Sequence, residues 1–164
     1  NTDYTDVNGL LPHSISLTIV GGADADIAQL LADIKGNGIN TNGSEEYTIT
    51  DSQGNTRVVR WNRPDIIDIY VTYELDVSSS YDVSFNDTIK DTLEDYSDTL
   101  SEGKDILRWQ LESLIPMSMN DNILDVNVKF AKTVTPTTNT AITITPTEKA
   151  RILRSNIVIN TTEV

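Results

Sequence analysis

Two glycines followed by two aspartates are the part of this sequence where residue types and spacing come closest to a ligand site. Gly21 and Gly22 stand between a run with strand-like alternation and a run with helical spacing. A glycine corner that opens a helix can cradle a phosphate on its free N–H groups. The GxxxxGK[ST] and GxGxxG spacings are missing, however, no Lys or Arg precedes Lys35, and Asp24 and Asp26 would repel a phosphate. The sequence therefore predicts a structural corner.

The residue types that usually carry catalysis are scarce. His13 is the only histidine, it lies beside Pro12 in a polar N-terminal stretch, and the chain has no cysteine. A histidine-based or thiol-based arrangement therefore has no support. Two carboxylates suffice for glycoside hydrolysis, but 25 acidic residues make any one pair uninformative. We expect no enzyme, with a small carboxylate-based hydrolase left as an alternative.

Calcium is the metal that the acidic residues suggest first. Asp24-x-Asp26 matches the first ligands of a calcium loop, but the remaining ligands and the glycine are missing at the required offsets. A second group of acids is predicted to share one helix face: Asp91, Glu94, Asp95 and Asp98. Acidic faces of this kind are usually solvated. No dedicated metal site and no cofactor are predicted.

The overall charge narrows the classes of partner. The 164 residues include 12 basic and 25 acidic side chains, for a net charge of −13. Nucleic-acid backbones and anionic membranes would repel such a surface, so neither is expected as a partner. No apolar run approaches the length of a membrane-spanning helix, and no small-molecule substrate is indicated.

Hydrophobic periodicity predicts the elements that position the corner. Alternation of apolar and polar residues predicts a strand over 14–20. A helix is predicted over 24–35, with one apolar stripe at i, i+3, i+4 and i+7: Ile27, Leu30, Leu31 and Ile34. A hairpin follows, in which alternating residues flank a turn over 51–55 and Arg63-Pro64 ends the pairing. The longest alternating run, over 67–77, predicts a strand with one apolar and one acidic face.

The second half begins after a composition break at residues 78–80. Helices are predicted over 86–100 and 104–115, and strands around 124–130, 142–144 and 157–159. A Thr-rich loop is expected over 133–140, and a short turn or helix over 147–151. The prediction is an α+β chain with mainly antiparallel sheets. It divides into an N-terminal arm or linker over 1–13, a first domain over 14–77 and a second over 78–164, with residues 78–80 as a hinge.

Charged faces are the candidate docking surfaces. Asp68 and Glu74 belong to the acidic face of the strand over 67–77, and Asp91 and Asp98 belong to the acidic helix face. The densest basic cluster is Arg57, Arg60 and Arg63, which we expect to pair with nearby Asp65 and Asp68 or, alternatively, to bind an acidic neighbour.

A family resemblance covers residues 10–77 and rests on the joint order of several short motifs. These are a strand ending in Gly21-Gly22, the acidic Asp24, Ile27-Ala28 in the helix, a loop from Gly38 to Gly43, a turn from Asp51 to Gly54, the aromatic Trp61, and Arg63-Pro64. In this order they resemble the baseplate J-like family, whose members are wedge components of contractile phage tails, prophage-derived particles and tailocins.

The second half resembles the same family more loosely. Gly103-Lys104-Asp105-Ile106 and Leu124-Asp125-Val126 match its outline, whereas residues 116–122 replace the tight Val-Pro-Gly-Val turn of many members with a longer segment. Family members are usually longer and carry a further domain ahead of this region. The resemblance therefore implies that this chain is the C-terminal portion of such a protein.

The resemblance implies a structural role without catalysis. The chain would make subunit contacts in a baseplate ring and transmit its rearrangement when the sheath contracts. Its partners would be other baseplate proteins and further copies of itself, in a virion or phage-like particle assembled in the bacterial cytoplasm. The Thr-rich loop and acidic surface leave one alternative from another class, a secreted or surface binding module for glycans or calcium.

Overall fold

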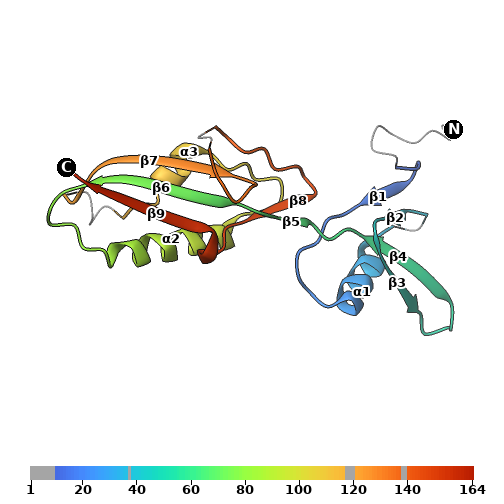
Figure 1. Cartoon of the computed structure of the whole chain (residues 1–164). Coiled ribbons are helices and arrows are strands. Elements are labelled where there is room, and N and C mark those ends of the chain that lie inside the picture. The colour runs from blue at the N-terminus through green and yellow to red at the C-terminus, as the bar shows by residue number, and fades with distance from the viewer. Residues whose placement is uncertain (1–9, 37, 117–120, 138–139) are drawn as a thin grey trace. The chain divides into compact units, whose positions relative to one another are not determined.

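The chain forms two compact units, which divide between Pro64 and Asp65 (Figure 1). A computed structural model describes residues 10–36, 38–116, 121–137 and 140–164. Most of the predicted N-terminal arm, the centre of the divergent segment 116–122 and the tip of the Thr-rich loop lie outside these residues. The predicted boundary between residues 77 and 78 is wrong, because the strand that ends there is an integral part of the second unit. Each unit is described by itself.

Unit 1, Asn1–Pro64, is a helix beside short strands. Its elements are β1 (Ser14–Ser16), α1 (Asp24–Ile34), β2 (Asn40–Asn42), β3 (Glu45–Thr50) and β4 (Thr56–Trp61). β3 and β4 form the predicted antiparallel hairpin, with Tyr47 opposite Val59. β1 pairs with β2 in parallel. The predicted strand over 14–20 is shorter than expected and continues only as an isolated parallel bridge between Thr18 and Asn62.

The core of unit 1 is small and lies between α1 and the hairpin. Its buried residues are Ile27, Ala28, Leu31, Val59 and Trp61. The apolar stripe predicted for α1 is therefore only half used. Leu30 and Ile34, which complete the stripe, are 59% and 65% exposed. The helix buries one edge of its stripe because a single two-stranded hairpin is too narrow to cover the whole of it.

Unit 2, Asp65–Val164, contains the longer strands and two further helices. Its elements are β5 (Asp65–Asp68), β6 (Tyr70–Val77), α2 (Phe85–Thr99), α3 (Arg108–Glu112), β7 (Ile123–Ala131), β8 (Glu148–Arg151), the 3-10 turn η2 (Arg154–Asn156) and β9 (Ile157–Glu163). The α+β class predicted from the sequence is confirmed.

β6 is the central strand of a three-stranded sheet ordered β7-β6-β9. β7 runs antiparallel to β6 and β9 runs parallel to it. A register shift next to Asp76 and Val77 marks a bulge where the β6–β7 ladder ends. Directly after it, Ser78 donates its N–H to the carbonyl of Asn122. The predicted hinge at residues 78–80 thus begins with a hydrogen bond inside unit 2.

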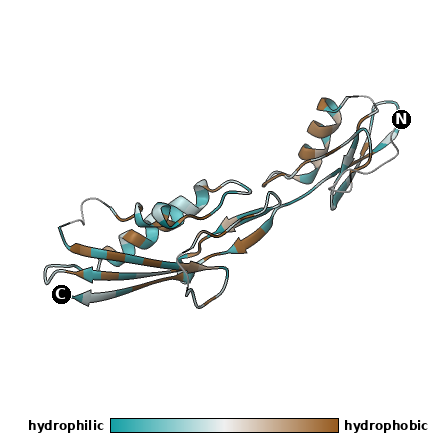
Figure 2. Cartoon of the chain, turned by 90° about the horizontal axis from the view of Figure 1, so that it is seen from above, coloured by the Kyte–Doolittle hydropathy of each residue, from teal (hydrophilic) through white to brown (hydrophobic). Residues whose placement is uncertain are grey.

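The predicted alternation along β6 is confirmed. Val71, Tyr73, Leu75 and Val77 are buried, while their neighbours are half-buried on the other face. Figure 2 shows the alternation as brown and teal bands along the strands. The buried face packs with α2 and α3 in one core, to which α2 contributes Ile89 and Leu93, and Leu100 follows directly after the helix. Such a sheet needs only one covered face, so its outer face can carry charge.

Three predicted elements of the second half differ from the structure. The helix predicted over 104–115 is reduced to the five residues of α3. The predicted strand around 142–144 is only an isolated bridge between Ile106 and Ile142. The turn or helix predicted over 147–151 is instead β8, which pairs in parallel with β5. In each case a partner distant in sequence decides the conformation. No helix among the described residues is long and apolar enough to cross a membrane.

Candidate functional site

The glycine corner, residues 20–24, is held by a single side chain from the end of unit 1. Nη1 of Arg63 donates to the carbonyl oxygens of Ile19, at 3.2 Å, and of Gly21. Nη2 donates to the carbonyl oxygen of Gly22 at 3.0 Å and to a carboxylate oxygen of Asp24 at 2.8 Å. The guanidinium thus binds three backbone carbonyls and one carboxylate across 39 to 44 residues of sequence.

Backbone geometry explains why glycines stand at this corner. Gly21 and Gly22 have φ angles of 64° and 79°, which side chains rarely adopt. These angles turn successive carbonyls toward Arg63. The first residue before α1 is Ala23, which makes no side-chain cap, and Asp24 is paired with Arg63 instead of capping the helix. With four protein acceptors on its guanidinium, Arg63 acts here as a structural brace.

Asn62 completes the same cluster and was missed by the sequence analysis. Its amide nitrogen donates to Oγ of Ser16 at 2.9 Å, and its amide oxygen accepts from the N–H of Ser44 at 3.0 Å. The backbone N–H of Asn62 donates to the carbonyl of Leu17, and its backbone carbonyl accepts from the N–H of Ile19. The only signal for Asn62 was its place between two motif residues, Trp61 and Arg63.

Other motif residues lie in the core beneath the hairpin. Ile27, Ala28 and Trp61 are buried together. A Cβ atom at Gly43 would lie 2.1 Å from the carbonyl carbon and oxygen of Trp61, so only glycine allows the loop to approach that strand. Gly38 is apart from this contact and serves a loop with a φ of 84°. Pro64 is the last residue of unit 1.

Asp51 and Gly54 shape the hairpin turn. The carboxylate of Asp51 accepts the N–H groups of Gln53 and Asn55, both at 2.9 Å, and Gly54 has a φ of 84°. Hydrogen bonds from the backbone and side chain of Asn55 lower the pKa of Asp51 below its ordinary value. This is an Asx-type turn, which fixes the hairpin and needs no ligand.

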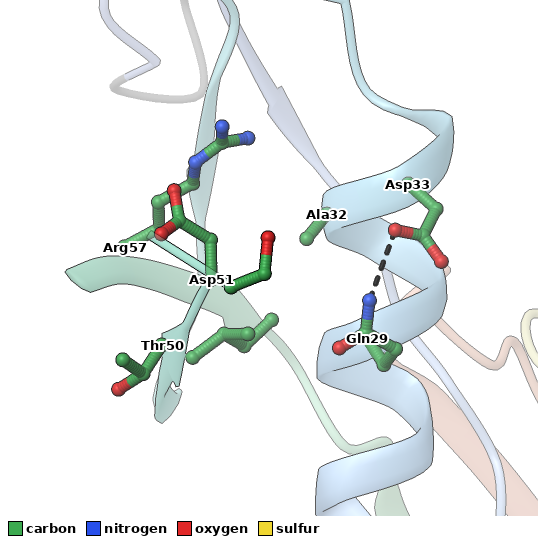
Figure 3. A pocket seen from close by; sticks show the side chains of 8 residues that line it. Gln29, Ala32, Asp33, Thr50, Asp51 and Arg57 are labelled. Atoms are coloured by element: carbon green, nitrogen blue, oxygen red, sulfur yellow. Dashed lines mark hydrogen bonds between the residues drawn. The ribbon is translucent and has the colours of Figure 1, made fainter. Parts of the chain in front are cut away.

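A shallow pocket of about 300 Å³ opens between α1 and the hairpin (Figure 3). Gln29, which donates to Asp33 at 3.0 Å, lies on the helix side, and Asp51 and Arg57 lie on the hairpin side. The pocket is lined by polar and charged groups together with the apolar Ala32 and Ile49, and no histidine or thiol is among its lining residues. Among the described residues, no three His, Cys, Asp or Glu side chains gather closely enough to hold a metal ion.

Three of the four acids predicted as docking surface are paired inside unit 2. Asp68 accepts from Arg151 at 2.8 Å, a pair that joins β5 to β8. Asp91 accepts from Arg154, which also bonds Asp87 at 2.8 Å. Asp98 is exposed, and its side chain makes no hydrogen bond or ion pair within the described part of the chain.

Glu74 lies on the outer face of the sheet and is the third of these paired acids. It accepts from Lys129 at 2.5 Å and from Asn127 at 2.8 Å. The hydrogen bond from Lys129 lowers the pKa of Glu74 below its ordinary value of 4.5. The carboxylate is thus held in the charged form by its own sheet.

The basic cluster pairs differently from the sequence prediction. Arg60 bonds Glu46 across the hairpin at 2.5 Å, and Arg63 bonds Asp24. Both carboxylate partners lie in unit 1, whereas Asp65 and Asp68, the partners expected from sequence proximity, belong to β5 of the other unit. Local sequence spacing was a poor guide here, since strand pairing and the corner supplied nearer carboxylates.

Comparison with known proteins yields no assignment. No protein-family model matches the chain, and no curated protein matches it either.

Proposed function

We propose that this protein is a structural, non-enzymatic component of a contractile-tail baseplate wedge, and that it is a member of the baseplate J-like family. Its partners are other baseplate proteins and further copies of itself, within a virion or phage-like particle. The ordered motifs from Gly21-Gly22 to Arg63-Pro64 are the basis of the proposal.

The observation that carries the proposal is the contact of Arg63 with the glycine corner. The motifs behind the resemblance are spread over more than forty residues, and scattered coincidences would have no reason to meet in space. Here the two glycines, the acidic residue and the arginine form one bonded cluster, with the aromatic Trp61 buried two residues away. That the motif residues form one bonded cluster supports the resemblance, and through it the family role.

The division into two units also suits a subunit that transmits a conformational change. Each unit has its own core, so each can keep its shape while contacts around it change. The joint that the proposal requires is the junction of Pro64 and Asp65, in place of residues 78–80. Proline limits the backbone there, because its ring fixes φ.

Localisation in particles tests the proposal. Contractile tails or phage-like particles would be purified from the source bacterium and labelled with antibody against this chain. We expect the chain to co-sediment with sheath and tube proteins, and gold label to gather at one end of the sheath. Recovery of the chain only at the cell surface or in the medium, with none in particles, would overturn the proposal.

A calcium titration separates the alternative binding role. We expect the melting temperature to stay unchanged within about 1 °C on addition of millimolar calcium, because ligand stabilisation requires binding to the folded state. A rise of several degrees that chelator reverses would favour the alternative and count against the baseplate role.

A further inference from the structure

The outer edge of β9 is an unpaired strand edge of unusual composition. β9 is the last strand of the β7-β6-β9 sheet, with β6 on one side and, among the residues that the structure describes, no strand on the other (Figure 1). Within the described chain, Val164 donates its N–H to Val77, and no other residue from Val158 onward makes a backbone hydrogen bond outside the ladder to β6. An open edge of this length is a template for pairing with another chain.

Charge is almost absent from this edge, although the chain carries a net charge of −13. The sequence of β9 is IVINTTE, and Glu163 at its end is its only charged residue. β7, at the opposite edge of the sheet, carries Asp125 and Lys129 and has a bulge in its pairing. β3, the edge of the hairpin in unit 1, begins with two glutamates. Charges and bulges are the usual protection of edges, and β9 has no bulge and a charge only at its last residue.

One hydrogen bond shows which backbone groups of β9 face the open edge. Val164 donates its N–H to the carbonyl of Val77, so its backbone faces β6. Successive residues of a strand turn their N–H and C=O groups to opposite sides. The groups of Ile157, Ile159, Thr161 and Glu163 therefore face away from β6. The N–H of Ile157 already donates to the carbonyl of Arg154, so the remaining groups are the ones left for pairing.

We propose that β9 pairs with β9 of a second copy of this chain, antiparallel and about a two-fold axis at Asn160. In that register Ile159 lies opposite Thr161 of the second copy, and Ile157 lies opposite Glu163, so outward-facing groups meet outward-facing groups. The N–H of Ile157 is already bonded to Arg154, so the pairing forms about six backbone hydrogen bonds, and it joins two sheets into one of six strands. The contact stands on the geometry of unit 2 alone and goes beyond the baseplate role.

The positions of the charges and of the helix-covered face favour antiparallel pairing with a second copy of this chain. Antiparallel pairing places the two Glu163 side chains at opposite ends of the interface, whereas parallel pairing would place them side by side. The same register sets Val158 opposite Thr162 on the outer face, and keeps the helices of both copies on one side of the joined sheet. Isologous pairing of this kind closes on itself and yields a dimer.

Sedimentation velocity of the 164-residue chain, from micromolar to near-millimolar concentration, tests the proposal. We expect the mass to rise from 18.1 kDa toward twice that value. Amide hydrogen exchange at Ile159 and Thr161 should slow at the concentrations where the dimer forms. A chain that stays monomeric over the whole range overturns the proposal.

Two sets of variants identify the edge and the occupant. Thr161→Pro removes an outward N–H without touching the ladder to β6, and we expect it to raise the dimer dissociation constant about 30-fold, because two hydrogen bonds are lost by symmetry. Thr161→Ala is the matched control and should leave the constant unchanged. A dimer that tolerates Thr161→Pro, with thermal unfolding like that of the wild type, contradicts pairing at β9.

Asn160 distinguishes a second copy from a different partner strand. A charge at this position would meet the same charge across the two-fold axis, so Asn160→Asp and Asn160→Lys should each weaken the dimer about fivefold. Asn160 is exposed, so these variants fold even where Thr161→Pro does not. Opposite effects of the two charges would show that the edge meets some other surface, and would overturn the two-fold arrangement.

Discussion

Removal of the Arg63 side chain should lower the stability of unit 1 and leave that of unit 2 unchanged. Arg63→Ala leaves three carbonyl oxygens and the carboxylate of Asp24 without their shared donor. The side chain of Arg63 is 29% exposed and its acceptors are mostly exposed, so we take about 0.5–1 kcal/mol for each carbonyl and about 0.5 kcal/mol for the ion pair. The free energy of unfolding of unit 1 should therefore fall by about 2–3.5 kcal/mol.

Urea unfolding followed by tryptophan fluorescence can isolate this effect. Trp61 is fully buried in unit 1, whereas Trp109 in α3 is 64% exposed, so a Trp109→Phe background leaves one reporter at little cost. The Trp61 transition should shift down by about 2 M urea in Arg63→Ala, at a slope typical of a small unit. Arg63→Lys should recover less than half of the loss, because one ammonium cannot reach acceptors arranged for a planar fork.

The matched control is Arg60→Ala, which removes only an exposed ion pair with Glu46 and should cost about 0–0.5 kcal/mol. The reasoning fails if Arg63→Ala is no more harmful than Arg60→Ala, or if Arg63→Lys is as stable as the wild type. Either result would mean that the corner is held by its own backbone geometry and that Arg63 contributes only charge.

Three further outcomes can be measured on the same chain. Gly43→Ala should destabilise unit 1 by about 3 kcal/mol or more in the same urea experiment, because its Cβ would overlap the backbone of Trp61. Tyr73→Phe should lower the stability of unit 2 in thermal unfolding by about 1–2 kcal/mol, since the buried hydroxyl donates to a carbonyl of α3 at 2.6 Å. Burial also raises the pKa of Tyr73 far above its ordinary value of 10.0, so the phenol should not titrate until the unit unfolds in alkali. Lys129→Met should raise the pKa of Glu74 toward 4.5 in a carboxyl NMR titration; in the wild type the depressed pKa stabilises the fold above about pH 4.5, and this contribution is lost as the pH falls through the folded value.

The strongest sequence patterns predicted their elements well. The alternation predicted for β6 is correct because β6 is the central strand of its sheet. Every second side chain points to the face that the helices cover. The helix predicted over 86–100 is α2, Phe85–Thr99, because its apolar residues Ile89 and Leu93 point to the same core. In both cases local periodicity and tertiary packing demand the same conformation.

The division into units was not predictable from local composition. The serines at 78–80 have the composition of a linker, yet they follow a strand whose partners, β7 and β9, come about fifty and ninety residues later. β8 was missed for the same reason. Only Ala150 is buried in that strand, so no alternation marks it, and its conformation comes from pairing with β5. Parallel strand pairs are hard to predict from sequence, because no short local motif such as a hairpin turn marks them.

The site was predicted as a set of positions but not as a set of bonds. Sequence order placed the glycines, Asp24 and Arg63 in one motif, and the positive φ angles of Gly21 and Gly22 agree with the residue types. That the guanidinium binds the carbonyls of the corner requires tertiary structure. Proximity in sequence suggested Asp65 and Asp68 as partners of the arginines, whereas the actual partner of Arg63 lies 39 residues away.

The bonds of Asn62 also decide how unit 1 would respond to tension. Thr18 and Asn62 form a parallel bridge, and the backbone of Asn62 bonds Leu17 and Ile19 on either side of it. The segments that lead into and out of the unit therefore run side by side in the same direction. Force applied to the two ends would slide these segments past each other and load their bonds together, in shear, rather than opening them one after another. Arg63 lies directly beyond this bridge and would be strained by the same displacement.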